Sequence, residues 1–173
     1  MILVEAGAGE EWDSRTDWEE LAERAVLSAV ASSSHAALNN SELAVEVSVK
    51  FTDDAELKAL NAAYRNKGSA TNVLSFPMFA AELLDQIVTA DGGEVLLGDV
   101  VLAHGVCAAE AADKGIAVET HAAHLVVHGT LHLLGYDHET SDDDAETMEK
   151  VEREALSAIG IADPYAVTEV QTH

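Results

Sequence analysis

Three histidines lie within eleven residues of one another, at His128, His132 and His138. The first two are four residues apart, so an α-helix would place both imidazoles on one face, one turn apart. Gly135 follows one turn after His132, and glycine ends helices by entering the left-handed conformation, which lets the chain bring His138 toward the first two. Three neutral nitrogen donors, with no fourth donor in the motif, predict one catalytic zinc ion per chain with an open coordination position.

The order His-x-x-x-His-x-x-Gly-x-x-His is close to the ligand spacing of the metzincin metalloproteases. Those enzymes carry a glutamate directly after the first histidine, as the general base for peptide hydrolysis. Here that position is Gly129, which has no side chain to accept a proton. A metallopeptidase or amidase therefore stays an alternative that needs a more distant carboxylate.

A metal ion held by three neutral ligands lowers the pKa of a bound water to about 7 in favourable cases. The nucleophile so formed can attack phosphorus or a carbonyl carbon. A phosphodiester already carries negative charge, and more develops on its oxygens during displacement. A nuclease therefore needs a cation beside the metal, and a guanidinium supplies one in a bidentate geometry.

Basic residues are few and unevenly placed along the chain. The net charge is −23, from 9 basic and 32 acidic residues, which favours solubility and opposes nonspecific nucleic-acid binding. Four of the basic residues fall in one segment of eighteen residues that holds only three acidic ones: Lys50, Lys58, Arg65 and Lys67. By itself the segment indicates a solvated helix face, but beside a metal motif it makes Lys50, Lys58 and Lys67 candidates for RNA binding.

Length and composition indicate a single domain over residues 1–173. The chain is 48% hydrophobic, which argues against disorder, and no apolar run approaches the length of a membrane span. The first residues lack a basic leader, and the one cysteine, Cys107, excludes a disulfide framework. We expect a cytoplasmic protein that does not engage a membrane.

Hydrophobic periodicity predicts short strands near residues 2–5, 44–51, 73–76 and 96–102, the last interrupted at Gly98. It predicts helices near 16–31, 54–64, 103–114, 118–134 and 141–159, the first opened by a capping box of Thr16 and Glu19. Residues 80–93 are expected to be a loop or a partial helix. The fold class is therefore α+β: a small mixed sheet packed with about five helices, with a metal-binding helix and glycine turn in a zincin-like arrangement.

Residues 128–138 resemble the signature of the YbeY family, bacterial rRNA maturation factors described as single-strand-specific endoribonucleases. Further motifs of the same family are similar to residues 60–67, 71–77, 97–99 and 163–165, in matching order and separation. The family often has Pro-Thr-Asp before Val-Leu-Ser-Phe-Pro, whereas this chain has Ala70-Thr71-Asn72. Ala70 thus loses a rigid turn residue, and neither change touches the histidines.

The resemblance implies that His128, His132 and His138 bind zinc and that Arg65 is the functional arginine beside the metal. It also implies a role in maturing the 3′ end of the small-subunit rRNA and in ribosome quality control, in the cytoplasm. Single-stranded RNA, rRNA and the ribosome or its proteins are the implied partners. Arg65 also fits the chemistry, because it belongs to both the basic segment and a family motif.

Two neighbouring residues have open roles. Asp137 could orient a ligand imidazole or could simply be a turn residue that caps the loop. His124 lies one turn before His128, close to the same helix face, and could either support a ligand or be structural, whereas His121 is expected to be structural.

A ribosome assembly factor with structural zinc and no bond cleavage is the second alternative function. A fourth protein ligand on the zinc, in place of water, would distinguish it from an enzyme.

Overall fold

Four strands form one mixed sheet in the order β1-β2-β4-β3. They are β1 (Ile2–Ala8), β2 (Ala44–Thr52), β3 (Val73–Pro77) and β4 (Glu94–Ala103). β1, β2 and β4 are parallel, and β3 runs antiparallel to β4 at one edge. The computed structural model describes residues 1–65, 71–84, 86, 92–137 and 141–164, and within the helices it leaves out the side chains of residues 64, 65 and 81. The predicted small mixed sheet is confirmed.

The described residues also form five α-helices. They are α1 (Trp18–Ser32), α2 (Asp54–Arg65), α4 (His104–Lys114), α5 (Val118–Leu133) and α6 (Asp142–Ala158). Short 3-10 helices occupy η1 (Ala36–Asn40) and η2 (Ala81–Leu83). None of the described helices is long and apolar enough to cross a membrane. The α+β prediction with about five helices is therefore correct.

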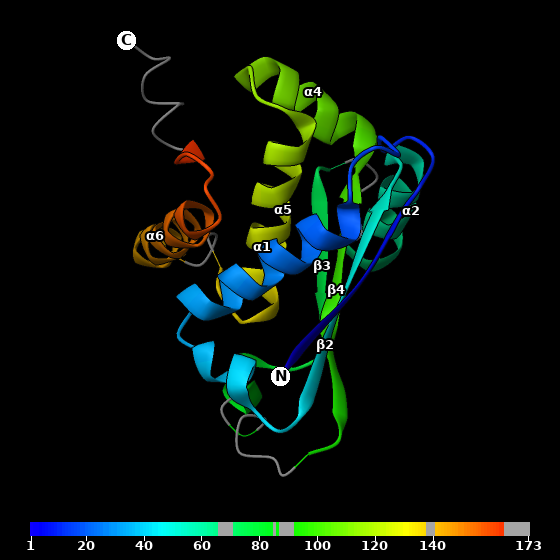
Figure 1. Cartoon of the computed structure of the whole chain (residues 1–173). Helices are drawn as coiled ribbons and strands as arrows, with labels where there is room; N and C mark the ends of the chain where they lie inside the picture. Colours follow the sequence, from blue (N-terminus) through cyan, green and yellow to red (C-terminus); the bar gives the residue numbers. More distant parts are fainter. Residues whose placement is uncertain (66–70, 85, 87–91, 138–140, 165–173) are drawn as a thin grey trace.

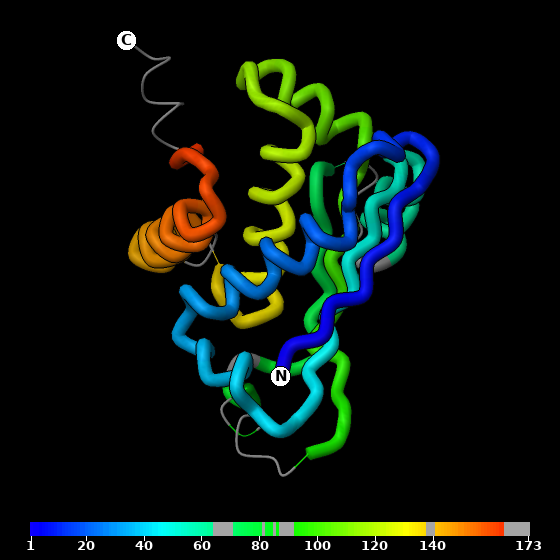
Figure 2. Tube along the Cα trace, in the orientation of Figure 1, coloured from blue at the N-terminus to red at the C-terminus, as the bar shows by residue number. Residues whose placement is uncertain are grey.

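The two faces of the sheet are covered by different helices. Successive residues of β4 alternate between them: Val100 and Leu102 join the large core that includes residues of α1, α5 and α6, whereas Val101 joins a small cluster with Leu57 of α2. Figure 1 shows α2 on one side of the strands and α1, α5 and α6 on the other. In the trace of Figure 2, α1 crosses α5, which it contacts. The histidine-rich helix α5 and helix α2 therefore lie on opposite faces of the sheet.

Two glycines let α5 sit close to the sheet. A Cβ atom at Gly129 would lie 2.7 Å from Val100 Cγ1, and one at Gly98 would lie 2.6 Å from Leu133 Cδ2. These separations are shorter than carbon atoms tolerate, so only glycine permits this approach of helix and strand. β4 is one strand that continues through Gly98, where the sequence predicted an interruption, but its pairing with β2 shifts register there, because Glu46 pairs with Leu96 and Val47 with Gly98.

The start of α1 also differs from the prediction. Asp17, rather than Thr16, is the N-cap, and its side chain accepts a hydrogen bond from the Glu20 amide. Thr16 instead donates its hydroxyl hydrogen to Glu119 of α5, at 2.9 Å. A contact with a distant helix thus takes the residue that local capping rules had assigned to α1.

Candidate metal centre

His128 and His132 lie on the same face of α5, near its C-terminal end. Their Nε2 atoms are 3.1 Å apart and their ring centroids 4.7 Å apart. Two nitrogens that each lie 2.0–2.1 Å from a tetrahedral zinc ion are separated by about 3.4 Å. The two imidazoles therefore face each other at a separation that suits a shared metal ion.

The helix ends as the glycine position predicted. Gly135 has a φ of 95°, and its amide donates to the His132 carbonyl at 3.0 Å. The Tyr136 amide donates to the Leu131 carbonyl at 3.0 Å, which completes a Schellman motif. The Tyr136 hydroxyl also accepts a hydrogen bond from the Ser34 amide at 2.9 Å, so the turn is tied to the end of α1.

Two of the predicted site residues follow this turn. Asp137 is exposed, two residues beyond Gly135. His138, the predicted third ligand, lies outside the described residues. Among the residues that are described, no group of three or more metal-binding side chains comes together.

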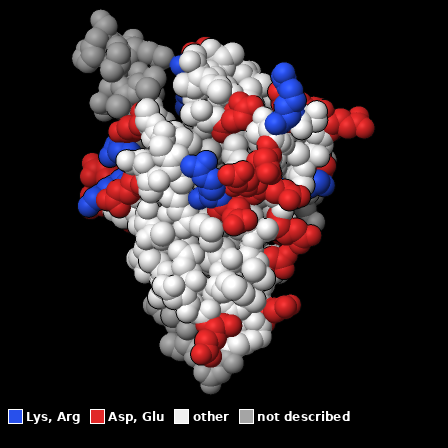
Figure 3. All heavy atoms as spheres, viewed as in Figure 1, with Lys and Arg blue, Asp and Glu red and all other residues white. Residues whose placement is uncertain are grey.

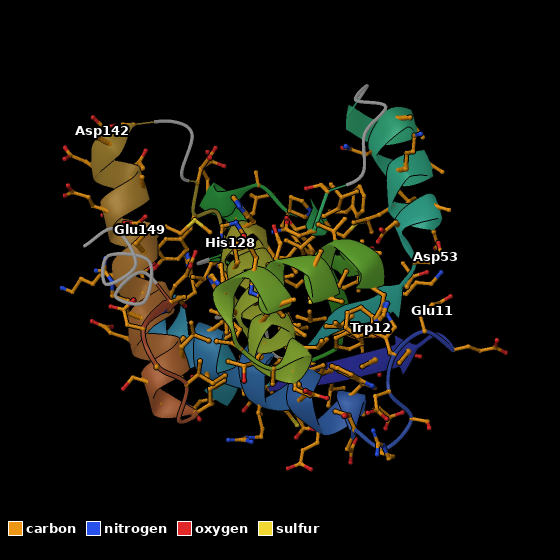
Figure 4. The ribbon with its side chains drawn as sticks, turned by 90° about the horizontal axis from the view of Figure 1, so that it is seen from above. Glu11, Trp12, Asp53, His128, Asp142 and Glu149 are labelled. Carbon is orange, nitrogen blue, oxygen red and sulfur yellow. The ribbon has the colours of Figure 1, made fainter. Side chains whose placement is uncertain are left out.

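A buried carboxylate that the sequence analysis did not identify lies behind this pair of histidines. Glu152 of α6 is only 1% exposed, with Oε1 2.6 Å from His128 Nδ1 and Oε2 3.0 Å from His124 Nε2. Burial alone would raise the pKa of Glu152, but the hydrogen bonds to His124 and His128 outweigh it and hold the pKa below its ordinary value. Figure 4 shows His128 between α6, marked by Asp142 and Glu149, and the α2 side of the molecule, marked by Asp53.

A sequence signal for Glu152 exists. The buried face of α6 includes Met148, Val151, Ala155 and Leu156, and Glu152 lies on the same face. A carboxylate within an apolar stripe must be paired, because an uncompensated buried charge is strongly unfavourable. The pattern predicts a buried partner for Glu152 but cannot say which one.

The same contacts decide which nitrogens are available to a metal. An ionised carboxylate only accepts hydrogen bonds, so both histidines donate to Glu152, His128 through Nδ1 and His124 through Nε2. The Nε2 atom of His128 then carries a lone pair directed at the Nε2 of His132. The facing Nε2 atoms of His128 and His132 therefore suit a zinc ion, whereas the Nε2 of His124 is engaged by Glu152.

A second histidine and carboxylate pair lies toward the other end of α5. His121 Nε2 is 2.8 Å from Glu110 Oε1 of α4, and the side-chain amide of Asn72 donates to the same oxygen at 3.1 Å. Burial lowers the pKa of His121, although the hydrogen bond with Glu110 opposes this. The contact joins α5 to α4 and to the segment that leads into β3.

Two of the four basic candidates, Lys50 and Lys58, have side chains that the structure describes, and neither lies beside the histidines. Lys50 forms an ion pair with Glu56 at 2.5 Å, on the sheet face that α2 covers, and Lys58 is exposed on α2. Arg65 is the last residue of α2, with its side chain outside the description, as is the whole of Lys67. In the face drawn in Figure 3, acidic side chains cluster on both sides of the molecule and basic ones are sparse.

Comparison with known proteins identifies the family. A sequence model described as Endoribonuclease YbeY matches residues 10–160. The protein named Endoribonuclease YbeY from Rhizorhabdus wittichii is 54% identical over 169 residues, which cover 98% of this chain and 99% of the relative. Those from Novosphingobium aromaticivorans and Zymomonas mobilis are 51% and 48% identical, covering 90% and 96% of this chain and 91% and 94% of their own lengths.

The fold has a counterpart among solved structures. A solution structure of a protein from Thermotoga maritima matches with a TM-score of 0.50 and 23% identity, covering 91% of each chain. At that identity the match speaks for the fold alone. The family model and the relatives, which extend over nearly the whole sequence, show that this chain belongs to the YbeY family of endoribonucleases.

Proposed function

We propose that the chain is a zinc-dependent endoribonuclease that hydrolyses single-stranded RNA, with one zinc ion held by His128, His132 and His138. Its class, a hydrolase that acts as an endoribonuclease, follows from membership of the family. The observation that carries the zinc proposal is the 3.1 Å separation of the two Nε2 atoms at the end of α5. The lone pair of His128 is directed into that space because its other nitrogen is engaged by Glu152.

A bound zinc ion supplies Lewis-acid activation of water and of a phosphoryl oxygen. The residues of the chain supply position and charge. His128 and His132 are fixed by a packed helix, which keeps their nitrogens aligned before any ligand arrives. Arg65, at the end of α2, is proposed to donate bidentate hydrogen bonds to the scissile phosphate and to stabilise charge that develops on its oxygens.

The proposed biological substrate is rRNA, with roles in maturing the 3′ end of the small-subunit rRNA and in ribosome quality control, in the cytoplasm. The family resemblance supports this choice, and charge supports a docked complex. A net charge of −23 repels free RNA, so contacts with the ribosome or its proteins would compensate for weak direct affinity.

Packing at Gly129 argues against the peptidase alternative. A Cβ atom there would be directed at Val100 of β4, 2.7 Å from its Cγ1. A glutamate at this position would therefore collide with the sheet rather than serve as a base beside the histidines. The position that carries the general base in metzincins here lets α5 pack closely against β4.

The test is cleavage of a single-stranded RNA by purified, zinc-loaded protein, with zinc content determined on the same preparations. We expect cleavage that a chelator abolishes and added zinc restores. His132→Ala is the control for contaminating nuclease. If the zinc-loaded protein cuts no more RNA than this control, the nuclease proposal fails and the assembly factor with structural zinc becomes the better explanation.

A further inference from the structure

The carboxylate of Glu152 lies on the protein side of the two facing histidines, away from the space between their Nε2 atoms. Its Oε1 contacts Nδ1 of His128, which is the ring nitrogen opposite the one directed at His132. Because the carboxylate can only accept, the proton of a neutral His128 resides on Nδ1 and the lone pair on Nε2. This tautomer is the one that can donate an electron pair toward His132.

The second oxygen of Glu152 is held by a different histidine. Oε2 lies 3.0 Å from Nε2 of His124, so both oxygens are occupied and the carboxylate plane is fixed between two rings. The rings of His124 and His128 are nearly perpendicular, at 82°. His124 thus acts on the metal centre through Glu152, by preventing the carboxylate from rotating away from His128.

The backbone of Glu152 is also immobilised by packing. Met148 and Ala155, one turn on either side of it, are buried in the main core. Ser28 of α1 donates its hydroxyl hydrogen to the Ala155 carbonyl at 2.6 Å, which ties this part of α6 to α1. The carboxylate therefore reaches His128 from a fixed point on another helix.

We infer that Glu152 is a positioning residue that selects the metal-binding tautomer of His128, with His124 as its brace, so that zinc affinity depends on the docking of α6 against α5. This inference rests on the proposed zinc site. It predicts that a side chain of the same shape that cannot accept hydrogen bonds from both histidines will weaken zinc binding without changing the fold.

The test combines two measurements that need no RNA. The first is the tautomer of His128 in metal-free protein, read from long-range ¹H–¹⁵N correlations of the imidazoles. The second is the zinc dissociation constant, from competition with a chelator, for the unmutated protein and for Glu152→Gln. Glu154→Gln is the matched control, because Glu154 lies on the same helix and is exposed.

We expect His128 to carry its proton on Nδ1, and Glu152→Gln to raise the zinc dissociation constant by about 10–100-fold, with Glu154→Gln unchanged. A His128 protonated on Nε2 in the unmutated metal-free protein overturns the inference, even if the variant does not fold. So does an unchanged zinc affinity in folded Glu152→Gln. If Glu152→Gln binds zinc more weakly and the unmutated protein cuts no RNA, the inference about Glu152 stands and the nuclease proposal fails.

Discussion

The two histidine and carboxylate pairs of α5 use the same chemical groups with opposite burial. His121 is 2% exposed and its partner Glu110 is 38% exposed, whereas His128 is 20% exposed and its partner Glu152 is 1% exposed. In the first pair the imidazole is sealed and the carboxylate reaches solvent. In the second the carboxylate is sealed and the imidazole is accessible.

This difference in burial supports the different roles that we propose for the two pairs. A sealed imidazole whose pKa is lowered by burial stays neutral and acts as a packed hydrogen-bonding group. An accessible imidazole with a buried acceptor behind it keeps one nitrogen for an external ligand. Exposure of the ring, rather than the presence of a carboxylate partner, therefore separates the candidate site from the structural pair.

The largest effect should come from removing an accessible histidine. His132→Ala should lose zinc and all RNA cleavage above background, because too few imidazoles remain to hold the ion at this position. Elemental analysis and single-turnover cleavage on the same preparations check this. A variant that keeps stoichiometric zinc would show that His132 is not a ligand.

His121→Ala is the matched comparison on the same helix. It should keep zinc and cleavage but lower the free energy of unfolding by about 1–3 kcal/mol, because a buried hydrogen-bonded side chain is lost. If His121→Ala instead loses zinc while remaining folded, the two pairs do not differ in the way that their burial indicates.

Arg65→Ala tests whether the residue that ends α2 takes part in the reaction at the histidines of α5. It should keep zinc and cut RNA about a hundredfold more slowly, since one charge-stabilising donor contributes about 3 kcal/mol in the transition state. Lys150→Ala, an exposed cation on α6 outside the basic segment, is the control and should change the single-turnover rate only slightly. Cleavage by Arg65→Ala at the unmutated rate would remove arginine from the mechanism.

Gly129→Ala tests how α5 is seated against β4, at the residue directly after His128. Alanine stabilises most helix interiors relative to glycine, but here its methyl group would lie 2.7 Å from the buried, stiff side chain of Val100. We expect a loss of about 1–3 kcal/mol in the free energy of unfolding, measured by denaturant titration.

A second substitution identifies the cause of that loss. Val100→Ala should cost less in the Gly129→Ala background than in the unmutated protein, because it relieves the collision. Gly7→Ala is the control, since a Cβ atom there meets nothing within 4 Å. Additive effects of the first two substitutions would locate the strain elsewhere.

The smallest effect concerns pH and the sealed pair. Because burial lowers the pKa of folded His121, the unfolded state binds more protons as pH falls through its ordinary value near 6.5. Its contribution to stability is thus complete above that pH and is lost below it. His121→Gln should make the free energy of unfolding less dependent on pH between 7.5 and 5.5, measured in metal-free protein so that ligand release does not contribute. Equal slopes for the two proteins would contradict a sealed imidazole.

Local chemistry determined much of this molecule. The apolar periodicities of the strands and helices act within one or two turns of the chain, as does the glycine after His132, and the structure has them. The four-residue spacing of His128 and His132 likewise brings their rings together on any α-helix. These features were predictable because their pattern is set by neighbours along the sequence.

Tertiary packing decided the rest, because it pairs residues that the sequence separates. His128 meets Glu152 only because α6 docks on α5, and Thr16 leaves its capping position because Glu119 lies within reach. The sequence alone therefore predicted which imidazoles bind a metal. The fold decided which of them has a buried carboxylate behind it, since burial and hydrogen bonding between helices arise only when the sheet and helices assemble.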